Sequence, residues 1–383
     1  MIVNTNVPAL FAENALTNTT NVLNQLEQQL STGYQINSPA DNPAGLAIAT
    51  LMSGELGGIN AAINNANQAV NLLETANGGI QNDVQIVTQI QQLATQASSS
   101  TETTQDQQDL QNEINSLLQQ LDNNAQSINY NTQVLLNGDY SAKVTSLTTG
   151  STITNITLGA DSGNAAAGSY TVVVAYSTSL SEYLVNIINS AGTVATATVN
   201  VSSTTNSAVA AQLVAGTSGN SGQTSFVVYF NPLQASTATG YSVAFSVSGA
   251  SQALTFQVGP QDAPSNEVTA NLGQFNSVTL GLQGISVVGV ANAQYAIQLA
   301  NNALSMLTNA QGQIGALQDQ LNYTIQNLQT ENTNLQAAKS TIMDANMANV
   351  MSNFTQEQIL QQTGMQALQS ADQLPALVLK LLG

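Results

Sequence analysis

Apolar residues recur at alternating spacings of three and four near both ends of this chain. Near the front the series runs from Ile59 to Val87, and Asn77 is its only polar interruption. Near the back it runs from Ile297 to Ile342, with polar residues at the seam positions Gln311, Gln318, Asn332 and Lys339. A sustained spacing of this kind places one apolar stripe on a helix and favours left-handed supercoiling. We therefore expect two long helical arms that bury their stripes by packing together, within one chain or between many.

Two further helices are predicted outside these arms. The first spans about residues 16–30, with Leu16, Leu23, Leu26 and Leu30 on one face, and the last spans about 347–372. A run of turn-forming residues at 37–45 and a break near Ala345 separate them from the long helices, because proline disfavours helical geometry in the residue before it. Two glycine pairs, 57–58 and 78–79, are weak points in the long front helix. Thr104 and Gln107 resemble a capping box for the next helix, which follows the long front helix.

Between about residues 140 and 288 the apolar period changes to two. Tyr241, Val243, Phe245 and Val247 alternate with smaller or polar residues. The runs 170–176 and 226–230 are almost continuously apolar, which is typical of strands buried on both faces. The sequence therefore predicts an α+β fold: long N- and C-terminal helices form a coiled coil or helical bundle, and a central β-rich outer domain is inserted between them.

Composition excludes several classes of function. The 383 residues include 21 acidic residues and only three lysines or arginines, which gives a net charge of −18. Nucleic-acid and anionic membrane surfaces are therefore improbable partners, since both need clustered cations. Without cysteine or histidine, thiol chemistry, His-ligated metals and imidazole-based triads are impossible. The insert carries few acidic residues (Asp161 and Glu182) and no paired carboxylates of the glycosidase type. No catalytic, cofactor or metal residue is predicted, and the chain is not expected to be an enzyme.

The start of the sequence lacks the basic region and long apolar core of a secretory signal peptide. No uninterrupted run of about 18 apolar residues occurs. We therefore expect no membrane insertion.

Several motifs, in order, resemble the bacterial flagellins. At the front they are residues 4–6 (NTN), 30–38 (LSTGYQINS), 40–48 (ADNPAGLAI), 92–97 (QLATQA) and 135–138 (LLNG); at the back they are 354–362 (FTQEQILQQ) and 378–382 (VLKLL). The segment 254–282 is similar to the β-rich part of the family's inner domain. The resemblance covers about 140 residues at the front and about 130 at the back.

The resemblance implies an extracellular subunit of the flagellar filament, which serves swimming motility. Five segments are expected: 1–37, an inner-tube helix; 38–143, the first part of the inner helical domain; 144–250, the variable outer β domain; 251–345, a β-hairpin region and the returning helix; and 346–383, a second inner-tube helix. A hook–filament junction protein is the alternative in the same architecture. A filament whose outer domain is also an adhesin is another.

Isolated helices of about 20 residues are marginal in water, so the terminal helices should order on polymerisation. We expect the polymerisation interface to include Leu16, Leu23, Leu26, Leu30, Val350, Phe354, Ile359, Leu360 and Leu368. The resemblance also implies export through the flagellar type III channel, a chaperone on the C-terminal helix, and contacts with hook-associated junction and cap proteins.

The sequence departs from the family where a flagellin-sensing Toll-like receptor binds. Alignment of the QLA motif at 92–94 places Gln89 where the family has a recognition arginine, whereas Leu93 and Glu113 match the other recognition positions. This departure predicts weak receptor activation.

The scarcity of cations has a physical consequence for a polymer. Subunits of charge −18 would repel one another at neutral pH, and protonation of carboxylates near pH 4 would relieve that repulsion. Adaptation to acid, screening by dissolved cations, and simple drift towards Asn and Gln are the three explanations we consider.

Overall fold

The computed structural model describes residues 6–140, 143–147, 153–158, 168–177, 182–189, 192–199, 209–215, 224–230, 241–248 and 253–382. The chain divides into two compact units, one made of residues 1–62 and 327–383 and the other of residues 63–326. Two long helices, α2 (Pro43–Ala97) and α5 (Val290–Met343), contribute to both units. The boundaries of the five predicted segments remain a prediction.

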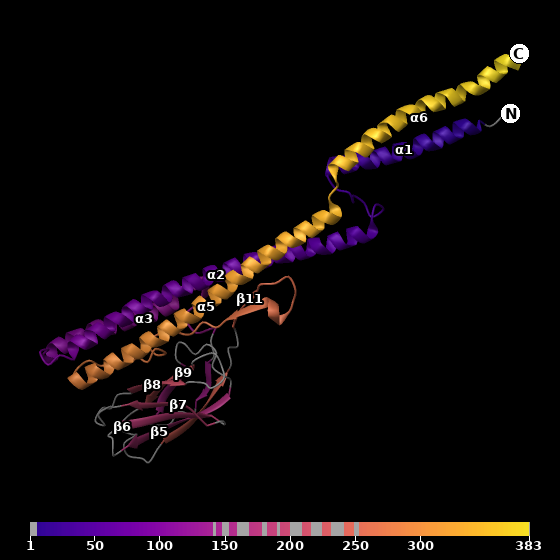
Figure 1. The fold of residues 1–383 in the computed structure, drawn as a ribbon. Coiled ribbons are helices and arrows are strands. Elements are labelled where there is room, and N and C mark those ends of the chain that lie inside the picture. Colours follow the sequence, from indigo (N-terminus) through magenta and orange to yellow (C-terminus); the bar gives the residue numbers. More distant parts are fainter. Residues whose placement is uncertain are drawn as a thin grey trace. The chain divides into compact units, whose positions relative to one another are not determined.

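In the first unit, α1 (Val7–Thr32) pairs with α6 (Met347–Leu382), and the two helices lie side by side in Figure 1. Asn6 caps α1, since its side chain accepts a hydrogen bond from the Ala9 amide at 3.3 Å. The same side chain donates to the Ala371 carbonyl of α6 at 2.9 Å. The cap therefore also fixes the start of α1 against α6.

Two short segments separate these helices from α2 and α5, as the turn residues predicted. The Gln35 amide donates to the Met343 carbonyl at 2.6 Å, and the Ala345 amide donates to the Gly33 carbonyl at 2.9 Å. Within the same unit, Asn332 of α5 donates to Asn60 of α2 at 3.0 Å. The polar seam position at Asn332 is thus filled by an amide pair between the two helices.

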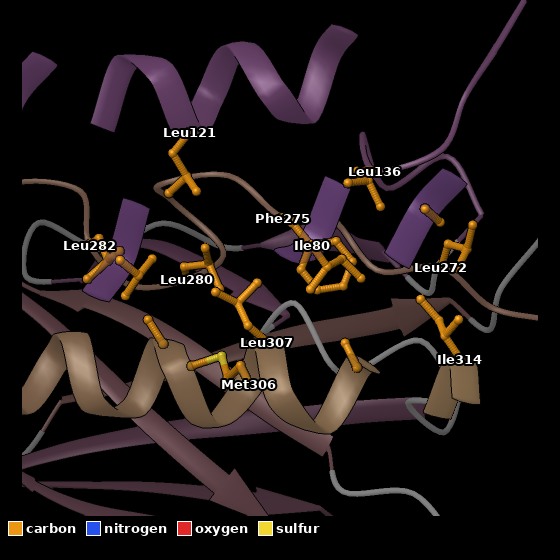
Figure 2. Close-up of a cluster of buried hydrophobic side chains, with 14 of the residues drawn as sticks. Ile80, Leu121, Leu136, Leu272, Phe275, Leu280, Leu282, Met306, Leu307 and Ile314 are labelled. Atoms are coloured by element: carbon orange, nitrogen blue, oxygen red, sulfur yellow. The ribbon is translucent and has the colours of Figure 1, made fainter. Parts of the chain in front are cut away.

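In the second unit, α2 runs without a break through Gly78 and Gly79 and packs with α3 (Thr104–Ser127) and α5. Figure 2 shows side chains from the three helices and from residues 271–288 converging on one core. The fully buried stripe of α2 differs from the predicted one, because Val84 is only half-buried. The seven positions of that stripe, spaced four and three apart, are Ala76, Ile80, Asp83, Val87, Ile90, Ala94 and Ala97.

The capping box of α3 also differs from the prediction. Thr103, not Thr104, is the N-cap; its hydroxyl accepts from the Asp106 amide at 3.2 Å, and Asp106 accepts from the Thr103 amide at 3.0 Å. The prediction was wrong by one residue, because Asp106 and not Gln107 closes the capping box.

Two hairpins accompany the helices. The first is β1 (Asn129–Tyr130) with β2 (Gln133–Val134), and the second is β11 (Leu254–Gln257) with β12 (Glu267–Ala270). The short helix η1 (Pro264–Asn266) lies between β11 and β12. The LLNG motif follows the first hairpin. The leucines of this motif are buried. Gly138 has a φ of 83°, and a Cβ atom at this position would lie only 2.7 Å from the Gln274 side chain, so glycine is required.

The central domain has two antiparallel sheets. The five-stranded sheet has the order β3 (Lys143–Leu147), β10 (Tyr241–Ser248), β5 (Gly168–Ser177), β6 (Glu182–Asn189) and β7 (Gly192–Val199). The three-stranded sheet has the order β4 (Ile153–Leu158), β9 (Thr224–Phe230) and β8 (Val209–Ala215). Side chains of both sheets share one apolar cluster, in which Tyr170 stacks on Phe245 with ring centroids 5.5 Å apart.

The two apolar runs behave differently. Residues 226–230 of β9 are all buried, as predicted. In β5, by contrast, Tyr170, Val172 and Val174 are buried while the residues between them are half-buried. One face of β5 therefore packs on the second sheet and the other does not. On β9, Tyr229 lies in the helical core, where its hydroxyl donates to the Val278 carbonyl at 2.6 Å.

One helix of the described residues, α2, is long and apolar enough to cross a membrane by length and composition. Its most apolar 18-residue window has mean hydropathy 1.4, and 22% of that window is buried inside the subunit. Core helices of soluble proteins meet the same test, so the absence of membrane insertion remains a prediction.

Adjacent glycines in α2 provide a matched test of the packing. A Cβ on Gly79 would lie 2.4 Å from Ile128 and 2.9 Å from Leu136, whereas a Cβ on Gly78 would meet nothing within 4 Å. Both Gly→Ala changes gain helix propensity, but only Gly79→Ala overpacks the core. We expect Gly79→Ala to be less stable than Gly78→Ala by about 1–3 kcal/mol in urea unfolding of the monomer. Equal stability would show that α2 does not approach Ile128 this closely.

Candidate assembly interface

Seven of the nine predicted interface residues on α1 and α6 are buried or half-buried in the first unit, where these two helices pair. Leu23, Leu26 and Val350 are buried there, at 7–8% exposure. Four others are half-buried: Leu16, Leu30, Phe354 and Leu368. These seven side chains are therefore covered, wholly or in part, within one subunit.

Ile359 and Leu360 are placed differently, since both are exposed on α6. They belong to a larger group of exposed apolar side chains that the sequence analysis did not single out. Of 14 large hydrophobic residues that are exposed in the described chain, 12 lie in the first unit, and the two exceptions are Val290 and Tyr323. The twelve are Val7, Leu10, Phe11, Val22, Tyr34, Ile48, Leu51, Met347, Met351, Ile359, Leu360 and Met365.

This concentration of apolar surface is unusual for a subunit that stays alone. Single exposed hydrophobic residues are normal, but a contiguous group usually marks an interface. Leu51 is 75% exposed and Phe11 is 72% exposed, so about three quarters of each residue contacts water. Burying such a side chain contributes about 1.5–3 kcal/mol before the costs of association. For Phe11 the available sequence signal was its position off the face of α1 that carries Leu23, because α1 has more apolar residues than one seam needs.

A carboxylate holds the segment that follows α1. Asp41 accepts hydrogen bonds from the backbone amides of Asn37 at 3.0 Å and Ser38 at 2.8 Å, and from the Gln25 side chain at 3.0 Å. The backbone bonds from Asn37 and Ser38 lower the pKa of Asp41 below its ordinary value of 3.8. The ionised carboxylate thus ties the turn to the middle of α1.

The three residues predicted to match receptor-recognition positions lie together in the second unit. Gln89 and Leu93 are one turn apart on α2, and the Gln89 side chain donates to Glu113 of α3 at 3.3 Å. Gln89 and Glu113 are exposed and Leu93 is half-buried. The arrangement is a small surface without a cation.

Comparison with known proteins identifies the chain. Residues 3–141 match the bacterial flagellin N-terminal helical region, and residues 297–382 match the C-terminal helical region. A flagellin from Clostridium tyrobutyricum is 30% identical over 392 residues, covering 97% of this chain and 99% of the relative. The chain belongs to the bacterial flagellin family. Polar flagellin F from Vibrio parahaemolyticus is 26% identical, with 100% of this chain and 99% of the relative covered.

A solved structure of flagellar hook associated protein-3 from Legionella pneumophila covers 76% of this chain, with 14% identity and a TM-score of 0.31. A likeness this low does not support a junction protein. The full-length matches to flagellins favour a filament subunit instead. The protein is a structural subunit of the extracellular flagellar filament, and it is not an enzyme.

The Asp41 contacts predict how the turn after α1 responds to acid. The pKa of Asp41 is lower in the folded subunit than its ordinary value of 3.8. Ionised Asp41 therefore stabilises the turn at pH values above 3.8, and this contribution is lost as the pH falls further. We expect the amide protons of Asn37 and Ser38 to be protected from exchange at pH 5 and to lose protection towards pH 2, after correction for intrinsic rates. Asp41→Asn should weaken protection already at pH 5, while Asp372→Asn, an exposed change on α6, should not. Unchanged protection in Asp41→Asn would contradict the assignment.

Proposed function

We propose that the subunit polymerises through the exposed apolar side chains of its first unit, while the Leu23 and Leu26 seam mainly keeps α1 on α6. The observation that carries this division is the gathering of 12 of 14 exposed large hydrophobics in that unit. Ile359 and Leu360 are then direct contacts between copies. The half-buried seam residues Leu16 and Phe354 contribute through the shape of the helix pair.

Assembly also supplies the stability that the helix pair lacks. The pair buries few side chains completely, and helices of this kind depend on tertiary packing for most of their stability. Contacts with neighbouring copies bury the opposite faces of α1 and α6. A repeated contact between different surfaces of identical subunits does not close on itself and generates a helical polymer.

The same exposed surface supports the proposed partners. Before assembly, a chaperone that covers Ile359 and Leu360 on α6 would prevent premature polymerisation during export through the type III channel. At the two ends of the filament, junction and cap proteins would meet copies of this surface that no other subunit covers. Each partner needs an apolar groove for α1, α6 or both.

A pair of substitutions on α6 tests the interface. We expect Ile359→Gln together with Leu360→Gln to raise the critical concentration for seeded polymerisation at least tenfold, which corresponds to about 1.4 kcal/mol. Gln358→Ala, an exposed change one residue earlier, is the control and should polymerise normally. Circular dichroism of the monomers checks that helix content is kept, and negative-stain electron microscopy reports filaments.

A truncated chain without the residues before 37 and after 345 should form no filaments under the same conditions. Normal polymerisation of the double Gln variant would place the contacts elsewhere in the first unit. Equal polymerisation of the truncated chain would remove the terminal helices from the interface altogether. Rings or short stubs from the full chain would indicate a junction protein.

We also propose that the surface of Gln89, Leu93 and Glu113 activates the flagellin-sensing receptor weakly, because Gln89 provides no positive charge. Depolymerised protein should therefore have low potency in a reporter-cell assay. Gln89→Arg should raise potency by an order of magnitude or more, since one charge-assisted hydrogen bond contributes about 1.5–3 kcal/mol. Gln81→Arg, exposed about two turns earlier on α2, should not. Full potency of the unchanged protein would contradict the proposal.

A further inference from the structure

A single carboxyl group interrupts the buried stripe of α2. The stripe positions on either side of Asp83 are Ile80 and Val87, and all three residues have 0% exposure. The stripe faces the core that α2 shares with α3. Leu121 of α3 belongs to this core, and Ala125 of α3 is also buried. A position that the helical spacing reserves for an apolar side chain is therefore occupied by an ionisable one.

Among the described residues, only one of the two oxygens of the Asp83 carboxyl accepts a hydrogen bond. Its Oδ1 atom accepts from the Asn124 side chain of α3 at 3.1 Å. Its Oδ2 atom is buried and has no hydrogen-bond partner among the described residues. The orientation of Asn124 is fixed, because its own side-chain oxygen accepts from Gln120 at 3.0 Å. Asn124 therefore presents its NH₂ group to Asp83 in both protonation states.

No cation compensates the charge of Asp83 within the described core. On α3, Asp122 is engaged by the Ser277 amide and hydroxyl at 2.8 and 2.9 Å, and Glu113 is exposed. On α2, Glu74 is exposed. The titratable residues that pack on this core from β1 and α5 are the tyrosines Tyr130 and Tyr295, and residues 290–318 contain no Asp, Glu, Lys or Arg.

The energetic consequence follows from desolvation. A buried carboxylate with one neutral donor loses much more hydration than it regains, whereas the protonated acid has no net charge to desolvate. Burial raises the pKa of Asp83 to about 7, and the hydrogen bond from Asn124 opposes this rise only in part. The folded subunit thus holds a proton that the unfolded chain releases near pH 4.

We propose that Asp83 is a proton-binding site that tightens the packing of α3 on α2 in acid and weakens it above neutral pH. Its contribution to stability is complete below the unfolded pKa of about 3.8, decreases as the pH rises, and is lost once the pH passes the folded value of about 7. The device is independent of the assembly surface, because it lies inside the core of the second unit.

The proton can be observed directly in the intact monomer. In protein labelled with ¹³C at the aspartate carboxyl, one signal should titrate near pH 7, and that signal should be missing from Asp83→Asn. A wild-type spectrum in which every aspartate titrates below pH 5 would sink the proposal, whether or not the variant folds.

Unfolding gives an independent measurement. Between about pH 4 and 7 the folded state holds one proton more than the unfolded chain, so the folding equilibrium constant should fall about tenfold for each unit rise in pH. Asp83→Asn, which is neutral and nearly the same shape, should lose that part of the slope and be more stable than wild type at pH 8. Glu74→Gln removes the same charge from an exposed site of α2 and should keep the wild-type slope. An unchanged slope in Asp83→Asn would overturn the proposal.

Discussion

Burial of apolar stripes between helices from opposite ends of the chain is the constraint on which the structure depends. A stripe on α2 has no local partner, so it is covered only when α3 and α5 pack against it. In the first unit the same requirement is met incompletely, because α1 and α6 cover one face of each other and leave apolar side chains such as Phe11 and Ile359 in water. The apolar core is thus complete in the second unit and incomplete in the first, and we propose that polymerisation covers the remaining apolar side chains of the first unit.

Polar groups inside these stripes act in two different ways. Asn332 of α5 donates a hydrogen bond to Asn60 of α2, and a neutral polar contact of this kind fixes the register of two helices without responding to pH. Asp83 occupies an equivalent position in the second unit but carries a group that can ionise. The contact between Asn332 and Asn60 is therefore independent of pH, whereas the packing around Asp83 depends on it.

The pKa shifts also bear on the three explanations for the shortage of cations. Acid weakens the turn held by ionised Asp41 and strengthens the core around protonated Asp83. The two effects have opposite signs and lie in different units. The effect of acid on stability therefore differs between carboxylates: it depends on whether the group is buried with one donor, as Asp83 is, or exposed with several, as Asp41 is.

The sequence alone determined the helical arms, the inserted β domain and the family, because helical and strand periodicities are local and the flagellin motifs are contiguous. It could not decide which apolar residues of α1 and α6 face each other, and so it treated Leu23 and Ile359 alike although one is buried and the other exposed. It placed Val84 in the seam and overlooked Asp83, since residue type argued against a buried carboxyl. It also predicted two buried faces for β5, of which the structure buries one. Which side of an element is covered is set by contacts between residues far apart in the chain, and only the tertiary structure fixes those contacts.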